Sequence, residues 1–268
     1  MKNILLKIII LFSLLSCKEN KLAESNVETS ILRIKFDNIA GDSNLILDSG
    51  IYYNHSKEDI IVTKFDYYIS NIKLSMKDGR DYVVPQDSSY FLIREDNQSS
   101  QLVTLNSIPI GDYDGIEFMI GIDSLRNTMN EAKRTGVLDP GGFESENEMY
   151  WAWNSGYIFV KVEGISTFGN PTNNKFYYHI GLFGGYSSST VNNTRIVKLK
   201  FGNDAVRPAK NNTSEILILT DVLKFFDGTG TNLSISSENA IMAAPVHWAL
   251  TAKIADNYQQ MFSYGGIR

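Results

Sequence analysis

Two of the three tryptophans of this chain lie two residues apart, in the segment MYWAWNSGYIFVKVEG. Trp151 and Trp153 stand immediately before a stretch that alternates like a strand. Such a pair has two interpretations. Large aromatic side chains stabilise a core when they are buried, and the same rings can form a site that uses indole chemistry. The ends of the chain and the surrounding elements decide between them.

The amino-terminal end predicts a secretory signal. Two lysines flank an apolar run that is far shorter than the ~20 residues of a membrane-spanning helix. The run ends in Leu-Leu-Ser-Cys, and the only cysteine, Cys17, resembles the acylated cysteine of a bacterial lipobox, the alternative being an incidental cysteine in a discarded peptide. We expect residues 1–16 to be a signal peptide, 17–30 a lipidated tether, and 31–268 a single β-rich domain. A lipid on Cys17 would anchor the protein to the cell envelope, on the periplasmic face or the outer-membrane surface.

The charge of the chain argues against nucleic acid as a partner. The sequence holds 25 basic and 30 acidic residues, a formal net charge of −5. Removing residues 1–16 deletes two lysines and no acid, so the remaining chain carries 23 minus 30, or −7. A net negative domain neither attracts a phosphate backbone nor forms a polybasic membrane patch.

Hydrophobic periodicity predicts an all-β, β-sandwich-like fold with a few short helices. A change of phase at Ser70-Asn71 predicts a bulge within the second strand. Strands are expected at residues 31–36, 64–74, 90–93, 101–105, 115–122, 157–163, 175–180, 194–201 and 215–219. Helices are expected at 125–135 behind Ser124 as a cap, at 222–226 behind Asp221, and at 250–262 as a C-terminal helix.

Motifs of known enzyme classes are missing from the sequence. It contains no Gly-x-Ser-x-Gly elbow, no His-Glu-x-x-His, no phosphate loop and no dinucleotide fingerprint. The histidines are three, namely His55, His179 and His247. We therefore predict no catalytic residues, with a hydrolase that uses scattered carboxylates as the remaining enzymatic alternative.

Six segments together resemble the MbnP-like copper-binding family, whose members are common as lipoproteins in Bacteroidetes. They occur in the family's order and spacing over nearly the whole mature chain, and they read FDYYISNIKLSMKDG, IPIGDYDGIEFMIGID, GVLDP, MYWAWNSGYIFVKVEG, YYHIG and AKIADNYQQMF. The resemblance implies a β-rich envelope protein that binds copper, in copper acquisition or handling. It also implies that a tryptophan is oxidised to kynurenine by an MbnH-like di-haem enzyme and helps histidines to form the copper site.

Carried onto this chain, the resemblance makes His179 and an oxidised Trp151 or Trp153 the predicted copper site, with His247 and Met149 as further candidates. An imidazole nitrogen suits copper. In the predicted strand at 175–180 the histidine lies opposite the apolar face. If the strand at 157–163 extends back to residue 149, both tryptophans lie on the side of Tyr157, and the two strands bring them beside the histidine.

Three alternatives stay open. Tryptophans near a strand often serve packing, a lone histidine is often hydrogen-bonded within the fold, and methionine packs more often than it binds metal. The chain also departs from the family where relatives often carry histidine, at Phe36-Asp37-Asn38 and at Trp153. A different function is a sugar- or protein-binding surface, formed by an aromatic strip of Trp151, Trp153, Tyr157 and Tyr177.

Overall fold

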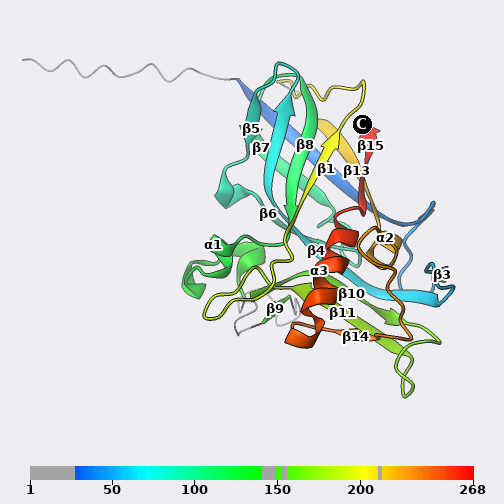
Figure 1. Cartoon of the computed structure of the whole chain (residues 1–268). Helices are drawn as coiled ribbons and strands as arrows, with labels where there is room; N and C mark the ends of the chain where they lie inside the picture. Colours follow the sequence, from blue (N-terminus) through cyan, green and yellow to red (C-terminus); the bar gives the residue numbers. More distant parts are fainter. Residues whose placement is uncertain (1–27, 141–148, 152–155, 211–212) are drawn as a thin grey trace, which may run out of the picture.

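The structure is a computed structural model, and it describes residues 28–140, 149–151, 156–210 and 213–268. Strands dominate it, as the periodicity predicts (Figure 1). The long strands are β1 (Thr29–Ala40), β4 (Asp59–Met76), β6 (Tyr90–Arg94), β7 (Leu102–Pro109), β8 (Tyr113–Ile120), β10 (Gly156–Ile165), β11 (Lys175–Gly181), β12 (Arg195–Lys200), β13 (Ser214–Asp221) and β15 (Phe262–Ile267). The short ones are β2 (Ser43–Asn44), β3 (Tyr52–Tyr53), β5 (Asp81–Val83), β9 (Tyr150–Trp151) and β14 (Ala240–Ile241).

The helical elements are short apart from the last one. All nine predicted strands are present, and the C-terminal helix is confirmed. The α-helices are α1 (Ser124–Asn127), α2 (Leu223–Phe226) and α3 (Trp248–Tyr258). The described residues also form the 3-10 turns η1 (Gln86–Ser88), η2 (Glu131–Lys133), η3 (Gly136–Leu138) and η4 (Pro245–His247). Within the described parts of the chain, none of the helices has the length and apolarity needed to span a membrane.

The strands form two mixed sheets. The smaller sheet has the order β15-β13-β1-β2, with β7 also paired to β1, and its β1–β13 pair is parallel. The larger sheet has the order β12-β8-β4-β10-β11-β14, in which β4 also pairs with β3, β5 and β6 and β10 also pairs with β9. The register of β4 on β8 shifts between Ser70 and Lys73, where Asn71 adopts a φ of 52°. The predicted bulge is therefore confirmed.

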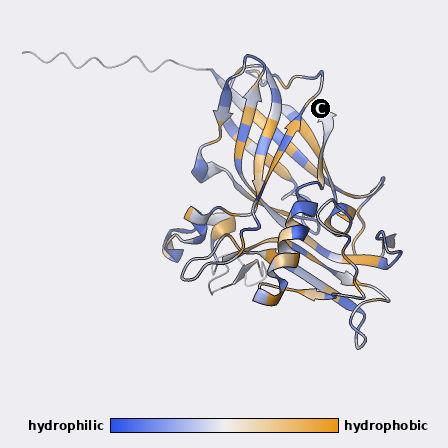
Figure 2. Cartoon of the chain, in the orientation of Figure 1, coloured by the Kyte–Doolittle hydropathy of each residue, from blue (hydrophilic) through white to orange (hydrophobic). Residues whose placement is uncertain are grey.

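Aromatic side chains fill the core between the two sheets. Phe262 of β15 packs edge-to-face against Phe36 of β1, Tyr67 of β4 and Phe118 of β8, with ring centroids 6.4, 5.6 and 5.2 Å away. All four rings are buried. The strands that carry them alternate between apolar and polar residues, as Figure 2 shows for the curled upper part of the molecule. One layer of rings thus ties both sheets to the last strand of the chain.

Two helix predictions are wrong in extent. The helix expected over residues 125–135 is a single turn, α1, because Asp123 caps it and Asn130 caps a separate 3-10 turn. The cap is thus Asp123, whose side chain accepts a hydrogen bond from the Arg126 backbone N–H, and not Ser124. The closing helix ends at Tyr258 rather than continuing to residue 262, since Phe262 begins β15.

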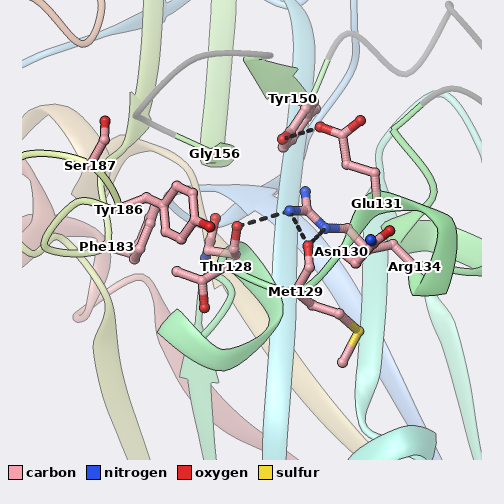
Figure 3. Close-up of a pocket in the computed structure, with 11 residues that line it drawn as sticks. Thr128, Met129, Asn130, Glu131, Arg134, Tyr150, Gly156, Phe183, Tyr186 and Ser187 are labelled. Atoms are coloured by element: carbon pink, nitrogen blue, oxygen red, sulfur yellow. Dashed lines mark hydrogen bonds between the residues drawn. The ribbon is translucent and has the colours of Figure 1, made fainter.

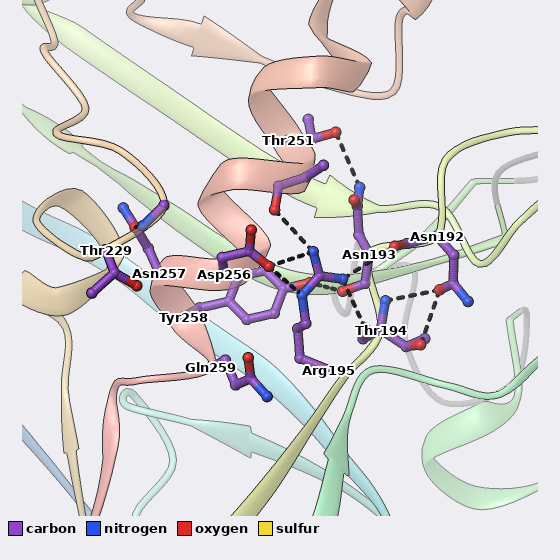
Figure 4. Close-up of polar contacts among 12 residues, drawn as sticks. Asn192, Asn193, Thr194, Arg195, Thr229, Thr251, Asp256, Asn257, Tyr258 and Gln259 are labelled. Carbon is purple, nitrogen blue, oxygen red and sulfur yellow. Dashed lines mark hydrogen bonds and ion pairs between the residues drawn. The ribbon is translucent and has the colours of Figure 1, made fainter.

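Hydrogen bonds and an ion pair hold helix α3 against the segment that leads from β11 into β12 (Figure 4). The buried amide of Asn193 donates to the Thr251 hydroxyl over 3.1 Å, and the Tyr258 hydroxyl donates back to the Asn193 carbonyl. The Arg195 guanidinium binds the Asp256 carboxylate over 2.8 Å. The same Asn193 amide donates to the carbonyl of Gly181, at the end of β11, over 2.8 Å. The helix therefore supports the strand that carries His179.

Candidate functional site

The two-residue strand β9 places Trp151, and it does so differently from the sequence prediction. Trp151 pairs with Gly156, and Tyr150 pairs with Tyr157, in an antiparallel hairpin with β10. The expectation that one extended strand runs back to residue 149 is therefore wrong, because the chain reverses between β9 and β10. Trp153 lies outside the described residues.

The histidine of β11 is held by a carboxylate of β10. His179 Nε2 lies 2.7 Å from Glu163 Oε1, and both side chains are largely buried, with exposed fractions of 12% and 19%. His179 lies across from Lys161, so Glu163, two residues further along β10, occupies the same face of the sheet. The hydrogen bond from His179 lowers the pKa of Glu163, although burial opposes the shift. Glu163 is therefore an ionised acceptor at neutral pH.

The indole of Trp151, on β9, lies against β11, the strand that carries His179. A Cβ added to Gly181 would sit 3.0 Å from Trp151 Cζ3. Gly181 is two residues after His179, and residues two apart share a face, about 6–7 Å apart along a strand. The structure thus brings Trp151 to the face of β11 that carries His179. The β9–β10 hairpin positions the ring, and Gly181, which has no side chain, leaves room for it.

The other two candidates have separate surroundings. Met149 is 2% exposed, and its carbonyl accepts the N–H of Ile158 over 2.8 Å. His247, in η4, has Nε2 3.7 Å from Glu238 Oε1, and its buried Nδ1 has no hydrogen-bond partner among the described residues. Within the same residues, no three His, Cys, Asp or Glu side chains are placed to hold a metal ion together. His179 and His247 are thus two separate histidine–carboxylate pairs.

A row of charged residues beside His179 was missed at the sequence level. Lys161 of β10 lies between His179 of β11 and Asp66 of β4, and Asp66 lies across from Arg94 of β6. Lys161 and Asp66 are each 1% exposed. Burial raises the pKa of Asp66 to about 6, against the effect of the Arg94 charge. The sequence contained a signal for this row, because Asp66 and Lys161 each stand in the middle of a strongly apolar strand, where a charged residue needs a partner.

The alternative of an exposed aromatic strip loses Tyr157, and its member Trp153 lies outside the described residues. Tyr157 is 1% exposed, its hydroxyl donates to the Leu138 carbonyl, and its ring packs edge-to-face on Tyr68 at 5.6 Å. The segment ending in η3 covers it, which periodicity along β10 does not reveal. Trp151 and Tyr177 are half-buried.

Asn38 is the buried polar residue of the segment Phe36-Asp37-Asn38 in β1. It is 1% exposed, accepts a hydrogen bond from the Tyr67 hydroxyl over 2.8 Å, and donates to Glu95 over 2.9 Å. These bonds link β1, β4 and the loop after β6. In this chain the position therefore supports the packing of the two sheets.

Comparison with known proteins agrees with this architecture. A sequence model of MbnP matches residues 29–243. The chain belongs to the MbnP family. The fold is similar to that of MbnP from Methylosinus trichosporium, with a TM-score of 0.58, 16% sequence identity, and coverage of 89% of this chain and 99% of that one. No curated protein matches the sequence significantly.

The range matched by the family model includes some of the candidate site residues and leaves out others. The MbnP family is associated with copper handling. The matched residues contain Met149, Trp151 and His179, whereas His247 lies beyond residue 243. Of the two histidine–carboxylate pairs, the one on β10 and β11 is thus within the matched part of this MbnP-family chain.

Proposed function

We propose that this MbnP-family protein binds copper at the face of β11 that carries His179, and that it serves in copper acquisition or handling without catalysis of its own. The observation that carries the proposal is the 2.7 Å contact between His179 Nε2 and Glu163 Oε1. A carboxylate that binds one nitrogen of an imidazole orients the ring and leaves the other nitrogen for a metal.

The donor set of this face suits copper. Because Glu163 is an acceptor, Nε2 of His179 donates to it, and in the neutral imidazole Nδ1 then keeps its lone pair for a metal. Imidazole nitrogen binds copper strongly. One histidine is a weak site by itself, and the described residues supply no cluster of three His, Cys, Asp or Glu. The proposal therefore needs further donors beside His179.

An oxidised tryptophan is the proposed second donor. Trp151 lies against Gly181, on the face of β11 that carries His179. Opening of its indole to kynurenine would leave an aryl amine and a ketone on the same side chain. An MbnH-like di-haem enzyme is the proposed oxidant, and Trp153 is the alternative target. Met149 and His247 complete the candidate donors.

We also propose that the protein is a lipoprotein of the cell envelope. Acylation of Cys17 would anchor it, and the residues between Cys17 and the start of β1 at Thr29 would form the tether. The support is the lipobox-like sequence at the end of the signal-like run. Copper handling at the envelope needs no membrane-spanning helix, because the anchor is the lipid.

Copper titration of wild type and two variants tests the site. The protein is isolated from its native host so that any modified tryptophan is retained, and Glu163→Gln and His55→Ala are compared with wild type. Glu163→Gln should weaken copper binding by about 10- to 100-fold, the usual effect of losing the partner of a metal-bound histidine. His55 is exposed and serves as the matched control, with unchanged affinity. Equal affinity of Glu163→Gln and wild type would contradict the proposal.

Peptide mass mapping of the same material tests the tryptophan. We expect the mass change of kynurenine formation on the peptide that contains Trp151 and Trp153, and an unmodified Trp248, whose indole N–H donates to the Ala243 carbonyl over 3.0 Å. Unmodified Trp151 and Trp153 in copper-binding protein would remove the oxidised tryptophan from the site.

A further inference from the structure

A second site lies on the other side of the β9–β10 hairpin. A pocket of about 800 Å³ is bounded by the segment from α1 to Arg134, by Tyr150 and Gly156 of the hairpin, and by the segment after β11 (Figure 3). Tyr150, Phe183 and Tyr186 give it aromatic walls. Side chains of successive strand residues point to opposite faces, so Tyr150 borders this pocket while Trp151 lies on the side of Gly181.

Arg134 is the buried charged residue of the pocket. Its side chain is fixed from one side, because Nε and Nη2 donate to the Met129 carbonyl over 3.0 and 2.6 Å and Nη2 also donates to the Asn127 carbonyl over 3.0 Å. The residue is 7% exposed. Its third nitrogen, Nη1, is buried and makes no hydrogen bond to any described residue. Figure 3 shows this nitrogen on the side of the guanidinium that faces Tyr150.

The charge of Arg134 lacks an anion among the described residues. Its acceptors there are the Asn127 and Met129 carbonyls, and the hydroxyls of Tyr150 and Tyr157 interact with it as neutral groups. Its guanidinium lies over the rings of the same two tyrosines, at 5.3 and 5.6 Å from their centroids. Such contacts compensate only part of the cost of burying a cation. An arginine cannot lose its proton to escape that cost. A buried guanidinium with a free nitrogen therefore matches an anion supplied by a ligand.

The size and walls of the pocket indicate which anion. Pockets of about 300–1,000 Å³ with aromatic walls and a few fixed polar groups hold small organic molecules. A bare phosphate or sulfate would leave the aromatic walls without contacts. The carboxylate of Glu131, which accepts the Tyr150 hydroxyl over 3.1 Å, lines the same pocket and would repel an anion of high charge.

We propose that this pocket binds a small organic carboxylate. The ligand's carboxylate pairs with Nη1 of Arg134, and its apolar part lies against Tyr150, Phe183 and Tyr186. The proposal is independent of copper, because none of these residues is a proposed copper ligand. It gives this protein a second ligand class, monoanionic organic acids with an aromatic or aliphatic body.

Benzoate and its neutral counterpart benzamide test the proposal on the full, copper-free chain. Ligand-observed NMR should show millimolar or tighter binding of benzoate, at least tenfold weaker binding of benzamide, and no competition by inorganic phosphate. Arg134→Gln should abolish benzoate binding. Arg126→Gln is the matched control, because Arg126 belongs to the same segment but pairs with Asp87, and it should bind as wild type does. Equal affinity for benzoate and benzamide, or the absence of benzoate binding to wild type, overturns the proposal.

A second variant covers the case in which Arg134→Gln does not fold. Glu131→Gln keeps an acceptor for the Tyr150 hydroxyl and removes the negative charge from the pocket. We expect it to bind benzoate roughly twofold to fivefold more tightly, the effect of one partly screened charge. Unchanged or weaker binding by Glu131→Gln would show that the ligand's carboxylate does not lie in this pocket beside Glu131, and it would overturn the proposal.

Discussion

The indole of Trp151 rests on Gly181, because a Cβ at that position would lie 3.0 Å from Trp151 Cζ3 and 2.5 Å from the Tyr157 carbonyl oxygen. The contact joins the β9–β10 hairpin to the strand that carries His179. A glycine is required there for close packing and not for an unusual backbone angle, since Gly181 is absent from the positive-φ glycines among the described residues.

Gly181→Ala tests this contact. The added methyl group overpacks against the Tyr157 carbonyl and the indole, so we expect a loss of about 1–3 kcal/mol in the free energy of unfolding. Tryptophan fluorescence should shift, and copper affinity should fall. Gly79→Ala is the control, because Gly79 has a φ of 87° and no atom within 4 Å of an added Cβ. It should lose stability through backbone strain while the fluorescence stays as in wild type.

The buried carboxylate of Glu58 should make stability depend on pH in acid. Burial alone would raise its pKa, but hydrogen bonds from Asn54, Ser236 and the backbone N–H groups of Ile235 and Ser236 lower the pKa from 4.5 to about 2. A depressed carboxyl pKa stabilises the fold above pH 4.5, and this contribution is lost as the pH falls toward 2.

Glu58→Gln should therefore cost about 1–3 kcal/mol of unfolding free energy near neutral pH, because it replaces a charged acceptor of several hydrogen bonds. Urea unfolding of both proteins measures the difference, which should shrink between pH 4.5 and pH 2. A difference that stays constant over that range would show that the charge of the Glu58 carboxylate does not stabilise its contacts with Asn54 and with the segment at Ile235 and Ser236.

The end of the chain should be indispensable for folding. Removing residues 250–268 deletes most of α3 and all of β15, and with β15 goes Phe262 from the aromatic layer between the sheets. Phe262→Ala alone should cost about 3–5 kcal/mol, whereas Phe168→Ala, at a ring that is 45% exposed, should cost less than about 1 kcal/mol. A truncated protein that unfolds cooperatively would contradict this expectation.

Cys17→Ser should release the protein from membranes. The acyl chains contribute ~0.8 kcal/mol per buried CH₂, and none of the described helices offers a membrane-spanning replacement. Asn20→Ser, in the proposed tether, should stay in the membrane fraction. If Cys17→Ser still sediments with membranes after a high-salt wash, the anchor is not a lipid on this cysteine.

Nine of the ten long strands were predictable from alternating or short apolar runs bounded by turn residues, and the bulge at Asn71 was visible as a change of phase. Strand β15 was not predictable, because Gly265 and Gly266 interrupt its pattern and its pairing partner β13 is distant in sequence. Hairpin β9 was not predictable either, since two residues carry no periodicity.

The candidate site was predicted in part. The alternation of β11 correctly set His179 apart from the apolar face, and the segment order indicated the family. The contacts that give His179 its orientation depend on register, which brings Glu163 of β10 beside it. The covering of Tyr157 by η3 and the support of Gly181 by Asn193 arise from segments far apart in the chain. Local sequence pattern contains neither.

The central claim is that His179 binds copper, and its most direct test is a copper titration of wild type and His179→Ala from the native host, at about pH 7.5 and about pH 5. Metal ligands must be deprotonated, so wild-type affinity should fall in acid. His179→Ala should bind far more weakly at the higher pH and show little further loss at the lower one. Equal, pH-insensitive binding by both proteins would contradict the claim.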